Sequence, residues 1–350
     1  MTRFLLAIYV LLAVYASLYP LSGWRDPGGP MFAFLAAPWP RYLTAFDVGA
    51  NFLGYAPFGL LCVLAVHPRL AAAKAVLLAV LSGGVLSLTL ESAQSFLPAR
   101  IASNLDVLAN VAGAAAGGIA ALALAPWLAG GGPLQRARAQ AFAPGVAADL
   151  GFALLGLWLF AQLNPATLLF GSGDLRDLFA GAAGARHAAQ LFVSVEAATT
   201  AANLMAVALL ASAGARPGVP VRGLVVALLA IALLVKTFAF AILMRAEHVF
   251  AWLTPGAQLG LAAGIVLALA ALRLPRTARL ALAAVLLMTA TVLVNLAPPN
   301  PYFAETLKVW EQGHFLNFNG LTRLVSAAWP FAALGYLVYL AAAQLRDPLR

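Results

Sequence analysis

Ten apolar runs of roughly membrane-spanning length constrain this chain more than any other feature of its sequence. A helix needs about 20 predominantly apolar residues to cross the hydrocarbon core of a bilayer. Such runs recur along all 350 residues, with mostly short segments between them. The sequence therefore predicts an all-α fold, a polytopic integral membrane bundle of about ten transmembrane helices. The runs are 4–21, 47–66, 75–97, 105–127, 149–170, 188–213, 222–244, 249–272, 279–297 and 323–344.

The composition excludes a water-soluble protein. The chain is 63% hydrophobic and only 9% charged, whereas soluble domains are roughly half apolar and a quarter charged. Its net charge of +9 comes from short basic clusters scattered between apolar runs. That distribution is typical of membrane loops and does not indicate nucleic-acid binding. The one cysteine, Cys62, excludes an internal disulfide.

The placement of Lys and Arg predicts how the helices are oriented in the membrane. With both termini in the cytoplasm, twelve of the 21 basic residues fall on the inside and eight on the outside. Of the twelve acids, only Asp149 and Asp347 fall inside. This follows the positive-inside rule. The first run, preceded by Arg3, also fits a signal peptide, and that alternative stays open.

One motif occurs twice, as DVGANFLG at 47–54 and DVLANVAG at 106–113. In the predicted topology both copies begin at the outer membrane face and run inward, as in a parallel duplication. The Asp, Asn and Gly of each copy lie near one helix face because they are four and three residues apart. Gly113 and Gly117 extend a strip of small residues, so we expect another helix to approach closely there.

A third polar patch lies between the two copies. The run 75–97 ends in LTLESAQSFLPAR, which places a polar stripe on one helix face before Arg100. Short loops would bring this patch to the same membrane face as both copies of the motif. Acids inside a membrane are costly and therefore indicate function, although helix capping and packing explain each residue taken alone. The candidate ligand-binding residues are Asp47, Asn51, Glu91, Gln94, Arg100, Asp106 and Asn110.

This pattern resembles the VanZ-like family of bacterial integral membrane proteins. The family pattern is Asp and Asn before Pro-x-Gly, then Glu-x-x-Gln, an Arg, and Asp-x3-Asn-x2-Gly. Besides the candidate residues, Pro57, Gly59 and Gly113 match it, and the resemblance covers roughly residues 1–127. It implies a four-helix domain in the bacterial cytoplasmic membrane. The founding member is linked to low-level teicoplanin resistance, so the resemblance also implies a role in the cell envelope.

The remaining two-thirds of the chain extends beyond the family pattern. A Gly/Pro-rich stretch at 128–148 is predicted to be a cytoplasmic linker, and 149–350 is predicted to be a second membrane domain of about six helices. Glu196 and Lys236 fall at equal depth in adjacent runs, which predicts a structural ion pair. The four histidines are dispersed, so we expect no zinc site, and no motif indicates a cofactor. Mg²⁺ or Ca²⁺ held by the clustered acids is a minor alternative.

Three functions fit the predicted site. The favoured one is a non-enzymatic protein whose outward-facing pocket binds a polar or anionic envelope ligand, either a lipid head group or a glycopeptide, with Arg100 contacting phosphate or carboxylate. The second is an enzyme acting on a lipid-linked substrate, with Glu91 as acid or base. The third is a proton-coupled transporter. The apolar inner halves of the first runs count against transport, and the oligomeric state is left open.

Overall fold

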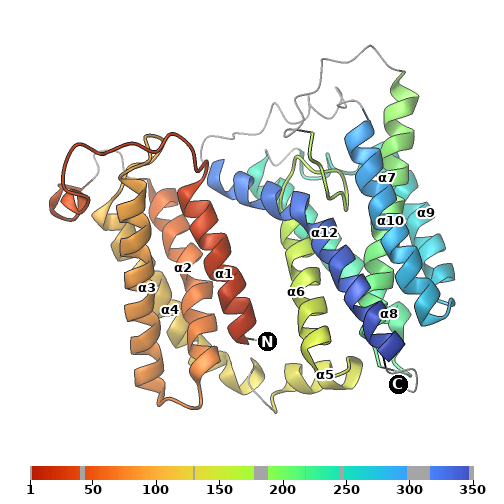
Figure 1. Cartoon of the computed structure of the whole chain (residues 1–350), viewed down its shortest axis with the longest axis horizontal. Helices are drawn as coiled ribbons and strands as arrows, with labels where there is room; N and C mark the ends of the chain where they lie inside the picture. The colour runs from red at the N-terminus through yellow and green to blue at the C-terminus, as the bar shows by residue number, and fades with distance from the viewer. Residues whose placement is uncertain are drawn as a thin grey trace. The chain divides into compact units, whose positions relative to one another are not determined.

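The computed structural model describes residues 2–39, 44–128, 131–176, 188–216, 218–244, 248–297 and 316–346. Within these ranges it contains eleven α-helices, one short 3-10 helix (η1) and no strand (Figure 1). The fold is all-helical, as predicted. The elements are α1 (Thr2–Leu18), η1 (Ala33–Ala36), α2 (Ala45–Val66), α3 (Ala72–Gln94), α4 (Asn104–Leu128), α5 (Pro133–Ala141), α6 (Val146–Ala161), α7 (Ala189–Ala213), α8 (Val221–Leu243), α9 (Pro255–Ala271), α10 (Arg276–Leu296) and α12 (Leu316–Arg346).

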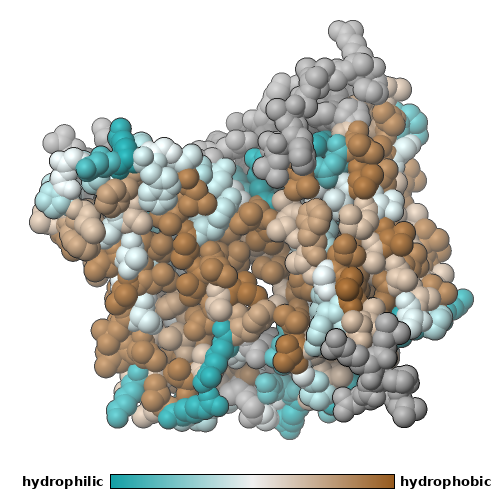
Figure 2. Space-filling model, in the orientation of Figure 1, coloured by the Kyte–Doolittle hydropathy of each residue, from teal (hydrophilic) through white to brown (hydrophobic). Residues whose placement is uncertain are grey.

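The helices are those of a multi-pass membrane protein. Seven described helices are long and apolar enough to cross a membrane, and α1, α6 and α9 are shorter apolar helices. Large apolar side chains point outward from them; Leu81, Leu234 and Val285 are each about 60–70% exposed. Figure 2 shows hydrophobic residues over the middle of the visible surface and hydrophilic residues near its ends. Lipid tails can cover such a surface, whereas water could not do so without a large free-energy cost.

The chain divides into two compact units, Met1–Ala139 and Gln140–Arg350. The boundary falls within α5, in the stretch that the sequence assigns to a linker. The first unit contains α1 to α4. The second contains α6 to α12, and its core is built around fully buried side chains of α6, α7, α8 and α12, among them Trp158, Phe240 and Trp329.

Close packing of α2 against α4 holds the first unit together. A methyl group on Gly113 would collide with the backbone of Phe52, and one on Gly117 would collide with Ala56. Gly59 of α2 lies equally close to Ala114 of α4. Four residues further along α2, from Phe52 to Ala56, the contact lies four residues further along α4, from Gly113 to Gly117. The two helices therefore run parallel. Gly113 and Gly117 therefore allow the close approach that the small-residue strip predicts.

In the second unit, one predicted membrane run is interrupted. The run 149–170 was predicted to be one span, but α6 ends at Ala161 and the following residues up to Arg176 are non-helical. Pro165 explains the break because it disfavours helical backbone at Asn164. The side chain of Asn164 then accepts the N–H of Ala166, at 2.8 Å, and forms a turn. Irregular backbone at membrane depth must be buried within the protein, and Gln162 and Asn164 are fully buried.

Candidate functional site

The candidate residues of the first unit gather where α2 and α4 begin and α3 ends. The segment between α1 and α2 folds over this end of the bundle. The backbone N–H of Arg25 donates to the Phe96 carbonyl, at 2.9 Å. The side-chain amide of Asn104 donates to the Ala37 carbonyl, at 2.8 Å. These contacts attach the segment to the loop between α3 and α4 and to the first residue of α4.

Asp47 lies in the first turn of α2, where its carboxylate interacts favourably with the helix dipole. Thr44 caps this helix. Its hydroxyl accepts the N–H of Asp47, at 3.1 Å, and donates to the Asp47 carboxylate, at 2.6 Å. Asp47 is exposed, so this carboxylate is open to the surroundings while one of its oxygens is held by Thr44.

Asp106 occupies the equivalent place in the first turn of α4 and is half-buried. Its carboxyl group interacts with the side chain of Asn51, the Asn of the other copy of the motif. It is also close enough to Asp47 and Glu91 for their charges to repel. The two copies therefore face each other across the α2–α4 contact, and each contributes an acid to the cluster.

Glu91 is the buried member of the cluster, with only 4% of its surface exposed. Its Oε2 atom accepts the backbone N–H of Ser103, at 2.9 Å. The Ser103 hydroxyl in turn accepts the N–H of Leu105, at 3.2 Å. Glu91 thus fixes the turn that starts α4. Exposure falls from Asp47 through Asp106 to Glu91, so the three acids form a gradient from the surface into the bundle.

Asn110 lies one turn deeper than Asp106 and is buried. Its Nδ2 atom donates to the Ser87 hydroxyl of α3, at 2.9 Å, while its Oδ1 atom has no hydrogen-bond partner. Tyr55 of α2 lies close to Ser87 and Glu91, but its hydroxyl makes no hydrogen bond of ordinary geometry. The polar cluster therefore continues into the helix interface with unused hydrogen-bonding capacity at two atoms.

Gln94 and Arg100 contact the end of α1. The amide of Gln94 donates to the Ser17 carbonyl, at 2.9 Å. The Arg100 guanidinium donates to the carbonyls of Ala16, at 3.1 Å, and Tyr19, at 2.7 and 3.1 Å. Cations and amides suit the carbonyl-rich end of a helix. Burial lowers the pKa of Arg100, while the charge of Glu91 opposes that shift.

A known protein family matches the part of the chain that contains this cluster. Residues 5–125 match the family model described as VanZ/LLP1. The N-terminal third of the chain is a VanZ-like domain. No curated protein and no solved structure matches the chain. The matched residues end within α4, so the family match covers the cluster and leaves the second unit unassigned.

Sequence reasoning missed two residues of the VanZ-like domain that organise the site. Thr44 and Ser103 cap α2 and α4, and each precedes the Asp of the motif by three residues. Ser or Thr three residues before an acid is a helix-start signal, so the repeat is longer than it first appears. The acid that binds the cap residue differs between the two copies. In α2 the Thr44 hydroxyl donates to the Asp47 carboxylate. In α4 the N–H of Ser103 is bound by Glu91, so Asp106 remains available to Asn51.

The predicted ion pair between Glu196 and Lys236 is wrong for this structure. Lys236 is fully buried, and its Nζ donates to the carbonyls of Asn164 and Thr167, each at 2.8 Å. Glu196 instead has Thr254, at the start of α9, as its polar neighbour. The interruption of α6 explains the error, since backbone carbonyls of the non-helical segment after it form a site for Lys236 that equal helix depth alone did not indicate.

No metal-binding cluster of three or more His, Cys, Asp or Glu side chains occurs in the part of the chain that the structure describes. In the VanZ-like domain the nearby acids are Asp47, Glu91 and Asp106, and Glu91 is bonded to Ser103. The exposed and half-buried acids can accept hydrogen bonds from a ligand. Gln94 and Arg100 bond to the end of α1. Asn51 contacts Asp106, and Asn110 contacts Ser87.

Proposed function

We propose that the VanZ-like domain binds the polar head of an envelope ligand, either a lipid head group or a glycopeptide, at the outer face of the bacterial cytoplasmic membrane. Asp47 and Asp106 accept hydrogen bonds from the ligand, and Asn51 orients Asp106. A role in envelope maintenance or glycopeptide tolerance would follow from this binding. The observation that carries the proposal is that an open acidic cluster lies beneath the segment between α1 and α2, whose aromatic side chains are exposed.

The segment covering the cluster carries large apolar side chains that face outward. Trp24, Phe32 and Trp39 are 49%, 49% and 69% exposed. Tryptophan concentrates at membrane–water interfaces, where its ring meets the head groups. Because this segment is bonded to the loop between α3 and α4, we infer that the acidic cluster lies at head-group depth.

The charge of the cluster favours a ligand that donates hydrogen bonds over an anion. The cluster contains three acids and one arginine, and the guanidinium of Arg100 bonds to the end of α1. We therefore revise the expectation that Arg100 contacts a phosphate. An ammonium or hydroxyl group of the ligand would reduce the repulsion between Asp47 and Asp106.

Catalysis by Glu91 is less well supported than binding. A general acid or base must reach the proton that it transfers. Glu91 is buried and holds the backbone of Ser103, which explains its presence without a reaction. Binding through the more accessible acids requires no rearrangement of this turn.

The test uses the full chain in detergent, titrated with short-chain phosphatidylethanolamine, whose ammonium donates hydrogen bonds, and short-chain phosphatidylcholine, whose ammonium cannot. We expect the wild type to bind the ethanolamine lipid more tightly. Asp47→Asn with Asp106→Asn should weaken that binding about tenfold, or about 1.4 kcal/mol. Asp26→Asn is the matched control, because Asp26 lies in the covering segment and binds its own turn. Equal affinity for both lipids, unchanged in the double variant, would contradict the proposal.

A further inference from the structure

The second unit contains a pocket of its own. The non-helical segment after α6 forms one side of it, and residues of α7, α10 and α12 form the rest. The empty space inside it, including the open mouth, is ≈ 640 Å³. Most of the lining is apolar, including Phe192, Val195 and Val294.

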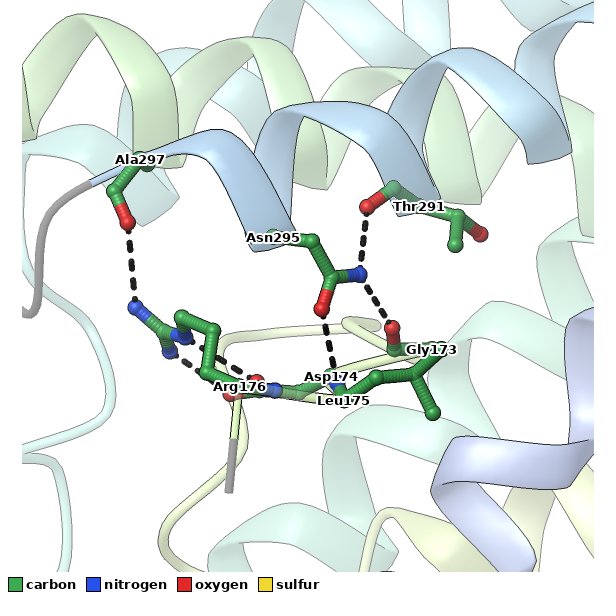
Figure 3. A network of polar contacts seen from close by, with 7 residues as sticks. All are labelled: Gly173, Asp174, Leu175, Arg176, Thr291, Asn295 and Ala297. Carbon is green, nitrogen blue, oxygen red and sulfur yellow. Dashed lines mark hydrogen bonds and ion pairs between the residues drawn. The ribbon is translucent and has the colours of Figure 1, made fainter. Parts of the chain in front are cut away.

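Hydrogen bonds from α10 hold one wall of the pocket (Figure 3). The Nδ2 atom of Asn295 donates to the carbonyls of Gly173, at 2.6 Å, and Thr291, at 2.8 Å. Its Oδ1 atom accepts the N–H of Leu175, at 2.8 Å. One side chain thus fixes three backbone groups. The wall is preformed, which lowers the ordering cost of binding a ligand.

Among the described residues that line the pocket, one carboxylate has no cationic partner. Asp174 and Arg176 pair with each other at 2.6 Å, and Arg176 also reaches the Ala297 carbonyl (Figure 3). Glu196 is 5% exposed and has the hydroxyl of Thr254 as its polar neighbour. The ammonium of Lys236 is bound to oxygen atoms of Asn164 and Thr167. A buried carboxylate is stabilised by hydrogen bonds or by an ion pair; Glu196 has a hydrogen bond from Thr254 and no cation beside it among the described residues.

A second polar group in the same pocket has no hydrogen-bond partner within the described part of the chain. Ser326 of α12 is 3% exposed, and its hydroxyl makes no hydrogen bond in the structure. Its position is fixed, because its carbonyl accepts the N–H of Gly173, at 2.8 Å. Buried polar side-chain atoms nearly always have a partner. The Ser326 hydroxyl therefore points independently to a hydrogen-bonding ligand.

We propose that this pocket binds a small amphipathic amine. Its ammonium group pairs with the Glu196 carboxylate, its hydrogen-bonding atoms reach the Ser326 hydroxyl, and its apolar part packs against Phe192 and Val294. A cation pairs with the carboxylate that the described residues of the pocket leave without a positive partner. The aromatic ring of Phe192 adds a surface that favours a cation or an apolar group.

The test measures binding of 2-phenylethylamine to the full chain in detergent by calorimetry, with 2-phenylethanol as the uncharged analogue. We expect the amine to bind the wild type and the alcohol to bind at least tenfold more weakly. Glu196→Gln should reduce amine affinity about tenfold or more, and Ser326→Ala several-fold. Asp149→Asn, an acid of the same unit that does not line the pocket, should bind as the wild type does.

Ser326→Ala keeps the test decisive if Glu196→Gln does not fold, because this change removes one hydroxyl from a small buried side chain. A wild type that binds neither compound, or binds both equally, would overturn the proposal. Amine affinity unchanged in Glu196→Gln, or in Ser326→Ala when only that variant folds, would overturn it as well. The outcome is independent of lipid binding to the VanZ-like domain, since the altered residues belong to the other unit.

Discussion

Glu91 shows how a single residue can combine a structural role with a place in a polar site. Its carboxylate completes the start of α4 through Ser103 and lies near the more open Asp106. An acid at this depth is costly unless its oxygens are satisfied. The Ser103 bond supplies part of that compensation, so the residue is expected to matter for folding before it matters for binding.

Substitutions at Glu91 should separate hydrogen bonding from charge. Glu91→Gln retains an oxygen that can accept the Ser103 N–H, whereas Glu91→Leu leaves this buried donor unpaired. We expect Glu91→Leu to be about 1–3 kcal/mol less stable than Glu91→Gln, measured by thermal unfolding in detergent. Thr89→Leu, on the exposed side of the same helix, should change stability little. Equal stability of the two Glu91 variants would show that the Ser103 bond is unimportant.

Asp174 should make the second unit sensitive to acid. Burial alone would raise its pKa, but the hydrogen bonds and charge of Arg176 outweigh burial, so the pKa is lowered. The resulting stabilisation is present above the ordinary Asp pKa of about 3.9 and is lost as pH falls through the lower folded-state value. We expect the Tm advantage of wild type over Asp174→Asn to be full at pH 6 and to shrink below pH 4. A pH-independent difference would contradict this assignment.

At the scale of elements, apolar length predicted where helices occur, and local chemistry decided where they end. Each of the ten predicted runs corresponds to a helix, but α6 stops before Asn164 and Pro165. Similarly, α9 begins at Pro255 after the cap Thr254, later than the apolar run alone predicted. These signals are present in the sequence. Hydropathy does not register them, because Pro restricts the backbone conformation of its neighbour and the Asn and Thr side chains bond to backbone N–H groups.

The duplicated motif provides an internal comparison of its two glycines. Gly113 lies against the backbone of Phe52, whereas the equivalent Gly54 has open space where a side chain would extend. We expect Gly113→Val to force α2 and α4 apart and lower the Tm by several degrees or prevent folding. Gly54→Val should be tolerated with a much smaller change. Similar losses in both variants would contradict the packing described for α2 and α4.

At the scale of the whole molecule, the sequence predicted the site of the first unit better than the interior of the second. Regular spacing placed Asp47, Glu91 and Asp106 at one end of the bundle because uninterrupted helices preserve periodicity. It did not reveal that Gln94 and Arg100 contact α1, since that requires knowing which helices are neighbours. The partners of Lys236 were unpredictable for a related reason, because they arise from a break in a helix.

The central claim is that the acidic end of the VanZ-like domain faces away from the cytoplasm, and labelling of single cysteines on intact cells tests it most directly. In a Cys62→Ser background, Ile101→Cys reports the acidic end and Lys74→Cys the opposite end, and both positions are exposed. We expect a membrane-impermeant maleimide to label position 101 on intact cells and position 74 only after permeabilisation. Labelling of position 74 from outside, with position 101 protected, would contradict the account.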